Sequence, residues 1–168
     1  NSALVGPSEG VRLRFLDRRN DQEVEFVIII GKQGSDISPD DALDYIAGYT
    51  LGLDMSLRGP EDRSFRKSID GYAPLGPWMV TADEIADPDN VPFKGFVNDE
   101  LRQDAHTKDL IYGIRRLIEF ASACYTIYPG DVYFTGSPAG VGRVKPGDVI
   151  RAECDLIGAM EVPVQAHQ

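Results

Sequence analysis

The pattern of hydrophobic and polar residues predicts that most of the chain is β-structure. Residues 23–32 (EVEFVIIIGK) are rich in valine and isoleucine, which favour strands, and a glycine closes the run. A second strand is predicted over residues 49–54. Further short strands, separated by Gly- and Pro-containing turns, are predicted over residues 132–135, 149–155 and 160–164.

Two main helices are predicted between these strands. In the first, over residues 38–48, Ser38 is the expected cap and Gly48 the expected end. In the second, hydrophobic residues recur at steps of three and four over residues 110–125, and Thr107 is the expected cap. Two helices in a mostly β chain indicate the α+β class rather than a doubly wound sheet.

Two intervening segments are predicted to contain no long helix. Residues 59–70 are polar and charged, which is typical of a surface loop. Residues 71–93 are interrupted repeatedly by proline and glycine, which end helices.

Length and charge narrow the range of functions. A chain of 168 residues fits one domain, and 27 acidic against 17 basic residues give a formal net charge of -10. A strongly acidic surface argues against binding nucleic acid or an anionic membrane. The longest apolar run, residues 26–30, is too short to span a bilayer. Cys124 and Cys154 form no spacing motif and are expected to be free thiols in a reducing, cytoplasmic compartment.

Three carboxylates stand out as candidate chemistry. Glu23 and Glu25, two apart in a predicted strand, project from the same face roughly 7 Å apart. One interpretation is a solvated strand end, or a charged edge strand that deters aggregation. The other is that both hold a hard divalent cation, with Asp54, at the end of the next apolar segment, as a third ligand. The spacing alone leaves both open.

Five segments together resemble the fumarylacetoacetate hydrolase superfamily, in the family's order and over almost the whole chain. They are QEVEFVIIIGK, AGYTLGLDMSLRG, KSIDGYAPLGPWMVTADEI, VNDELRQ and YPGDVYFTGSPAGVGRVKPGD. The resemblance implies a mixed β-sheet roll. It also implies that Glu23, Glu25 and Asp54 ligate Mg²⁺, which is Mn²⁺ or Ca²⁺ in some members.

The resemblance implies roles for four further residues. Arg58 matches an active-site arginine that can pair with a substrate carboxylate. Lys67 matches a lysine near the metal that can support a developing enolate. Gly136 and Ser137 match a Gly-Thr pair that contacts substrate oxygens, with serine keeping the hydroxyl. For Arg58 and Lys67, a surface salt bridge is the alternative interpretation.

The resemblance also sets expectations for the whole protein. Family members that hydrolyse or decarboxylate use a His-Glu pair on an N-terminal lid, upstream of the stretch matched by residues 2–7. Residues 1–168 are therefore expected to be the catalytic domain without that lid. The segment between Asp54 and Lys67 is short for a family hydrolase, which leaves the substrate open.

The expected substrate is a small 2-oxo acid, and the expected assembly is a homodimer. The first expected activity, with Mg²⁺, is hydrolysis of a carbon–carbon bond in an acylpyruvate such as fumarylpyruvate. Isomerisation or decarboxylation of 2-hydroxyhepta-2,4-diene-1,7-dioate, as in the breakdown of aromatic compounds, or decarboxylation of oxaloacetate, is the alternative. A catalytically inactive metal-binding module is the third.

Overall fold

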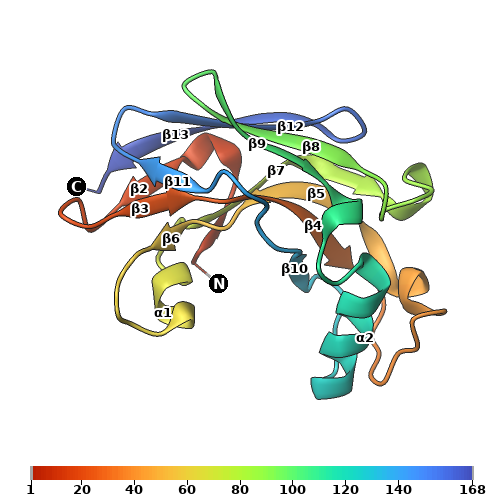
Figure 1. Cartoon of the computed structure of the whole chain (residues 1–168). Helices are drawn as coiled ribbons and strands as arrows, with labels where there is room; N and C mark the ends of the chain where they lie inside the picture. The colour runs from red at the N-terminus through yellow and green to blue at the C-terminus, as the bar shows by residue number, and fades with distance from the viewer. Residues whose placement is uncertain (1, 168) are drawn as a thin grey trace.

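The computed structural model describes residues 2–167 and places two five-stranded sheets on top of each other, with a three-stranded sheet at one end (Figure 1). The first sheet has the order β1 (Leu4–Val5), β7 (Ala73–Thr81), β5 (Ile46–Leu53), β4 (Val24–Ile30) and β10 (Val132–Phe134). The second has the order β2 (Val11–Leu13), β13 (Gly158–Ala166), β12 (Val149–Cys154), β8 (Pro92–Val97) and β9 (Glu100–His106). The small sheet has the order β11 (Gly142–Val144), β3 (Asn20–Gln22) and β6 (Ser56–Leu57).

The two five-stranded sheets are mixed, because β1 pairs with β7 and β2 with β13 in parallel while their other pairs are antiparallel, and the three-stranded sheet is antiparallel throughout. Within the described residues there are two α-helices, α1 (Arg63–Lys67) and α2 (Ile114–Cys124). Short 3₁₀ helices are η1 (Pro7–Glu9), η2 (Ala42–Tyr45), η3 (Ala82–Glu84) and η4 (Thr107–Asp109). The α+β, mostly β fold class is confirmed.

The predicted strand over residues 23–32 is confirmed as β4, and its alternation explains the core. Its even-numbered residues belong to the hydrophobic core between the sheets, where the ring of Phe26 stacks on that of Tyr49 of β5 at 5.2 Å. The sheets approach closely at Gly95 of β8, because a Cβ there would lie 2.7 Å from Val24 Cγ2. The odd-numbered residues of β4 therefore face away from this core.

The predicted helix over residues 38–48 is wrong. Within this range only Ala42–Tyr45 are helical, as the 3₁₀ helix η2. The strand β5 begins at Ile46, which pairs with Ile30 of β4. Gly48, taken as a helix end, lies inside β5, where a Cβ would approach Val80 O of β7 to 2.2 Å. Sheet pairing thus overrides the local helix signal.

The second predicted helix is shorter than expected, and Thr107 does not cap it. Thr107 Oγ1 accepts a hydrogen bond from Val91 N at 2.8 Å, and the helix α2 begins only at Ile114, whose N–H donates to Asp89 Oδ1 at 2.8 Å. The segment 59–70, predicted as a loop, contains α1, capped by Asp62. Residues 71–93 hold no long helix, as predicted.

The other strand predictions are confirmed with altered ends. Residues 49–54 fall in β5 and just beyond it, and residues 132–135, 149–155 and 160–164 correspond to β10, β12 and β13. No helix within residues 2–167 is both long and apolar enough to cross a membrane.

Candidate metal centre and active site

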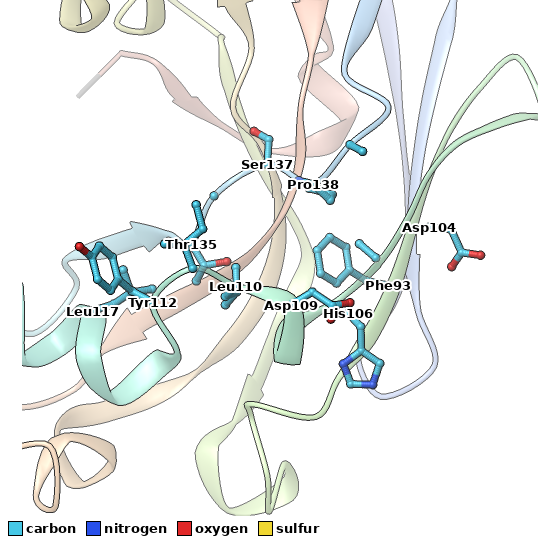
Figure 2. A pocket seen from close by; sticks show the side chains of 14 residues that line it. Phe93, Asp104, His106, Asp109, Leu110, Tyr112, Leu117, Thr135, Ser137 and Pro138 are labelled. Carbon is cyan, nitrogen blue, oxygen red and sulfur yellow. The ribbon is translucent and has the colours of Figure 1, made fainter.

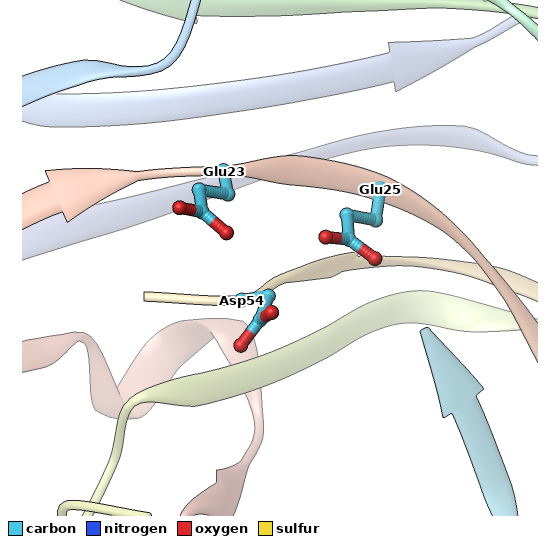
Figure 3. Close-up of side chains that lie close together, drawn as sticks. All are labelled: Glu23, Glu25 and Asp54. Atoms are coloured by element: carbon cyan, nitrogen blue, oxygen red, sulfur yellow. The ribbon is translucent and has the colours of Figure 1, made fainter. Parts of the chain in front are cut away.

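The three predicted carboxylates meet beside the small sheet, on the outer face of β4 (Figure 3). Glu23 lies in the one-residue break between β3 and β4, Glu25 lies on β4, and Asp54 follows β5. One carboxylate oxygen of each lies within 4.8 Å of the others. The backbone N–H of Asp54 donates to Glu23 O at 2.8 Å, which extends the pairing of β4 with β5 and holds the ligands together.

The loop after β10 supplies hydrogen-bond donors to this cluster. Thr135 Oγ1 donates to Phe26 O at 2.8 Å and anchors the loop on β4. Gly136 N donates to Glu25 Oε2 at 2.7 Å. The Ser137 hydroxyl lies 2.7 Å from Glu25 Oε1 and 2.9 Å from Glu23 Oε2, and can donate its one proton to either. Gly136 and Ser137 thus reach the carboxylates directly.

Two cations face the cluster from its more exposed side. Arg58 donates from Nε to Asp21 Oδ2 at 2.7 Å and from Nη2 to Glu23 Oε1 at 2.9 Å. Lys67, at the end of α1, donates from Nζ to Glu23 Oε2 at 2.8 Å and also to Asp54. The side chains of Arg58 and Lys67 are 40% and 34% exposed, against 8% for Glu23. Arg58 and Lys67 therefore border the cluster where it is closer to solvent.

Asp21 is a charged residue of this site that the sequence analysis did not identify. Its side chain is 1% exposed, and it accepts from Arg58 Nε and from Arg19 Nε, each at 2.7 Å. It precedes Glu23 by two positions, so the spacing that marked the glutamates also marks Asp21. A buried carboxylate between two guanidinium groups orients Arg58 toward Glu23.

Burial makes the carboxylates costly to ionise. Desolvation raises the pKa of Glu25 to about 7, although hydrogen bonds from Ser137 and Gly136 act in the opposite direction. Desolvation also raises the pKa of Asp54, against the lowering effect of Lys67. Burial opposes the charge of Lys67, but hydrogen bonds to Asp54 and Glu23 outweigh burial, and its pKa is raised.

The donor set fits a hard divalent cation. Magnesium and manganese prefer oxygen ligands, and one or two carboxylates with further oxygen atoms are their usual protein ligands. Here three carboxylates, two of them buried, bring one oxygen each within 4.8 Å of the others. A dication would offset the cost of burying their charges, to which desolvation contributes most and mutual repulsion less.

A separate pocket is lined in part by the loop that carries Ser137, with Thr135, Gly136 and Ser137 in its wall (Figure 2). It has a volume of about 520 Å³ and is mainly apolar, with Phe93, Leu110 and Leu117 in its wall. His106 lines this pocket rather than the carboxylate cluster, and its Nδ1 accepts from Lys108 N at 3.2 Å.

Comparisons with known proteins agree on one family. Residues 1–165 match the family model "Fumarylacetoacetate (FAA) hydrolase C-terminal". Maleylpyruvate hydrolase of Aquipseudomonas alcaligenes is 52% identical over 166 residues, which cover 99% of this chain and 58% of that protein. The chain therefore spans less than two thirds of this relative.

Solved structures of related enzymes have the same fold as this chain. Maleylpyruvate hydrolase from Sphingobium sp. SYK-6, in complex with manganese (II) ion and pyruvate, has a TM-score of 0.95 and 45% identity, covering 99% of this chain and 62% of that one. A 5-carboxymethyl-2-hydroxymuconate delta-isomerase from Mycobacterium smegmatis has a TM-score of 0.90 and 35% identity. The match covers 99% of this chain and 67% of the isomerase chain.

Proposed function

The chain belongs to the fumarylacetoacetate hydrolase family, and we propose that the protein is a divalent-metal-dependent hydrolase that cleaves a carbon–carbon bond of an acylpyruvate such as maleylpyruvate or fumarylpyruvate. The observation that carries the proposal is the convergence of Glu23, Glu25 and Asp54 beneath two cations. Similarity to maleylpyruvate hydrolases supports the substrate class, including one solved with manganese and pyruvate.

The reaction adds one water across one carbon–carbon bond. The bond between the acyl carbon and the methylene of the pyruvate unit breaks, hydroxide ends on the acyl carbon, and a proton ends on the methylene. Maleylpyruvate and water thus become maleate and pyruvate. A divalent cation held by the three carboxylates would polarise the 2-oxo acid and stabilise the negative charge that develops as the bond breaks.

The chain's own residues orient the substrate in this proposal. Arg58, held by Asp21, keeps an N–H free for a substrate oxygen, and its planar guanidinium suits a carboxylate. Lys67 brings a positive charge, held by Glu23 and Asp54, to the same side and would stabilise a developing enolate. Ser137 and Gly136 keep two ligand carboxylates in place, and the serine hydroxyl can turn toward a substrate oxygen.

Three finer points belong to the same proposal. The ion is Mg²⁺ or Mn²⁺, because the ligands are all oxygen. The compartment is the cytoplasm, because Cys124 and Cys154 are free thiols. The assembly is a homodimer, because Ile111 is 95% exposed with the half-exposed Tyr112 beside it, and such side chains are typical of interfaces. Sedimentation of the full-length protein tests the dimer.

Isomerisation is the second candidate activity. The observation that favours it is the close structural match to a 5-carboxymethyl-2-hydroxymuconate delta-isomerase. A metal-bound 2-oxo acid with a cation beside it supports proton transfer as well as bond cleavage, so the carboxylate cluster alone does not separate the two reactions.

The test is product analysis with the full-length protein. Maleylpyruvate, fumarylpyruvate, oxaloacetate and 2-hydroxyhepta-2,4-diene-1,7-dioate are each incubated with Mn²⁺ or with EDTA. Equimolar pyruvate and dicarboxylic acid, formed only with metal, support the proposal. An isomer or carbon dioxide instead supports the alternative, and no turnover of any substrate with metal refutes an enzymatic role.

A further inference from the structure

A small pocket beside the carboxylate cluster is lined mainly by cations. It has a volume of about 230 Å³, and its wall consists of Glu23, Ser56, Arg58, Arg63, Arg66 and Lys67. Four positive side chains thus face one carboxylate, in a chain whose net charge is -10. A concentration of positive charge against the overall balance attracts an anion to this position.

Two of these cations lack a direct ionic contact within the described residues, although Arg66 is near enough to Glu61 and Asp62 to help lower the pKa of both carboxyls. Arg58 and Lys67 are paired with buried acids, as described above. Arg63 and Arg66 form no salt bridge with any residue between 2 and 167. Arg66 Nε donates to Glu61 O at 2.9 Å, which positions its guanidinium and leaves the other N–H groups free.

The helix α1 explains why these side chains act together. Arg63, Arg66 and Lys67 lie at steps of three and four, so they share one face of the helix. Asp62 caps its start, accepting from Ser64 N at 2.8 Å. One face of this short helix therefore places Lys67 next to the carboxylates. The same face places Arg63 and Arg66 next to Lys67.

Ser56 independently indicates a polar ligand in the same pocket. Its side chain is 1% exposed, and Oγ has no hydrogen-bond partner among residues 2–167. A buried hydroxyl without a hydrogen-bond partner is unfavourable. A ligand oxygen in the pocket would accept its proton.

The apolar pocket of Figure 2 is a poor place for a second negative charge. Asp104 and Asp109 lie in its wall, and no lysine or arginine lines it. A carboxylate there would face two aspartates, with His106 as the only residue of the wall that can carry a positive charge. A charged group on the acyl side of the substrate is therefore directed to the cationic pocket, whereas an uncharged acyl chain would suit the apolar one.

We propose that Arg63 and Arg66 form a subsite for the second carboxylate of a dianionic acylpyruvate, at its acyl end. This inference rests on the proposed function, and it adds which residues would let the protein distinguish between acylpyruvates. The protein selects acylpyruvates with a charged acyl end, such as maleylpyruvate, over those with an uncharged end, such as acetylpyruvate.

The test compares R63Q/R66Q with wild type and with R12Q/R143Q in the full-length protein. Arg12 and Arg143 are exposed, lie on β2 and β11, and are outside this pocket, so the control removes the same charge elsewhere. The ratio kcat/KM is measured with Mn²⁺ for maleylpyruvate and acetylpyruvate. The inhibition constants of the products maleate and pyruvate are measured alongside.

We expect R63Q/R66Q to lower kcat/KM for maleylpyruvate about 10- to 100-fold, since charge-assisted hydrogen bonds are lost. We expect less than about a twofold change for acetylpyruvate, and weaker inhibition by maleate with unchanged inhibition by pyruvate. Calorimetric titration of maleate, with and without EDTA, should show weaker binding to R63Q/R66Q than to R12Q/R143Q.

The possible results distinguish failure of the subsite from failure of the proposed function. If wild type hydrolyses both substrates and R63Q/R66Q keeps the same preference between them, the subsite is wrong and the proposed function stands. If wild type hydrolyses neither acylpyruvate, the proposed function is wrong. Unchanged binding of maleate to R63Q/R66Q rejects the subsite in either case.

Discussion

Replacing Glu25 by glutamine should stabilise the protein in EDTA at alkaline pH while destroying its response to metal. Glu25 is 2% exposed, and desolvation raises its pKa from an ordinary 4.5 to about 7. Below pH 4.5 the carboxyl is protonated in both folded and unfolded chains, and its burial is at its most favourable. As the pH rises to about 7, the unfolded chain releases the proton first, so this stability is progressively lost.

The magnitude follows from the size of the pKa shift. Each pKa unit corresponds to about 1.4 kcal/mol, so a shift from 4.5 to about 7 costs the folded protein on the order of 3 kcal/mol above pH 7. Glutamine is neutral and similar in shape, and its amide can still accept from Gly136 N. E25Q avoids the charge, and its melting temperature in EDTA at pH 8 should exceed that of wild type by up to about 6–12 °C.

The assay is thermal unfolding of wild type, E25Q and the exposed-site control E161Q at pH 5 and pH 8, with EDTA or Mn²⁺. Glu161 is exposed on β13, so E161Q should follow wild type throughout. Manganese at 100 times its Kd should stabilise wild type by about 2.7 kcal/mol, and E25Q by much less. The reasoning is refuted if E25Q in EDTA differs from wild type by the same amount at both pH values, or if Mn²⁺ stabilises both equally.

Three further predictions concern the loop, the helix and a tight turn. S137A removes a hydrogen bond that lowers the pKa of Glu25 in the folded protein, so the loss of stability in EDTA should still begin near pH 4.5 but continue to a higher pH and become larger; an unchanged profile would contradict this. D89A removes the acceptor at the start of α2 and should lower the free energy of unfolding in urea by about 1 kcal/mol, whereas the conservative D89N should recover part of it. G140A should cost more than about 1 kcal/mol, because Gly140 has φ +95° and a Cβ would lie 1.7 Å from Arg102 O; a melting temperature equal to wild type would refute it.

The strand at the centre of the molecule was predictable because its signal is local. In β4, every second side chain enters the core, and the same period places Glu23 and Glu25 on the other face. Asp54 joins them only through the pairing of β4 with β5, in which Val24 lies opposite Leu53. That register is a long-range property, so the sequence pattern suggested Asp54 as a third ligand but left the metal interpretation open, and the family resemblance favoured it.

The failures have one physical cause, which is contact between distant segments. Gly48 was interpreted as a helix end, but it is glycine because β7 passes too close for a side chain. The β8–β9 hairpin was not predicted, although Asn98 and Asp99 both have positive φ and connect two strands through a two-residue turn. Its strands are polar on one side and lack the valine-rich composition of β4.

The parts of the site that the sequence did not predict also depend on contacts between distant segments. Nothing local indicates that Ser56 is buried without a partner, or that Arg63 and Arg66 lie in the same pocket as Glu23. The charged segment 59–70 is predicted from the sequence to be a surface loop. Its helix forms beside β6 and thereby directs charged side chains toward the cluster.

The central claim, that Glu23, Glu25 and Asp54 together hold one divalent ion, is tested most directly by counting that ion. Free Mn²⁺ is followed by electron paramagnetic resonance while it is titrated into metal-free protein at pH 8, for wild type, D54N and the control E161Q. The account predicts one ion per chain for wild type and E161Q, and binding weakened by at least about 100-fold in D54N, as loss of one charged ligand implies. Equal binding by D54N and wild type, or no stoichiometric binding by wild type, would contradict it.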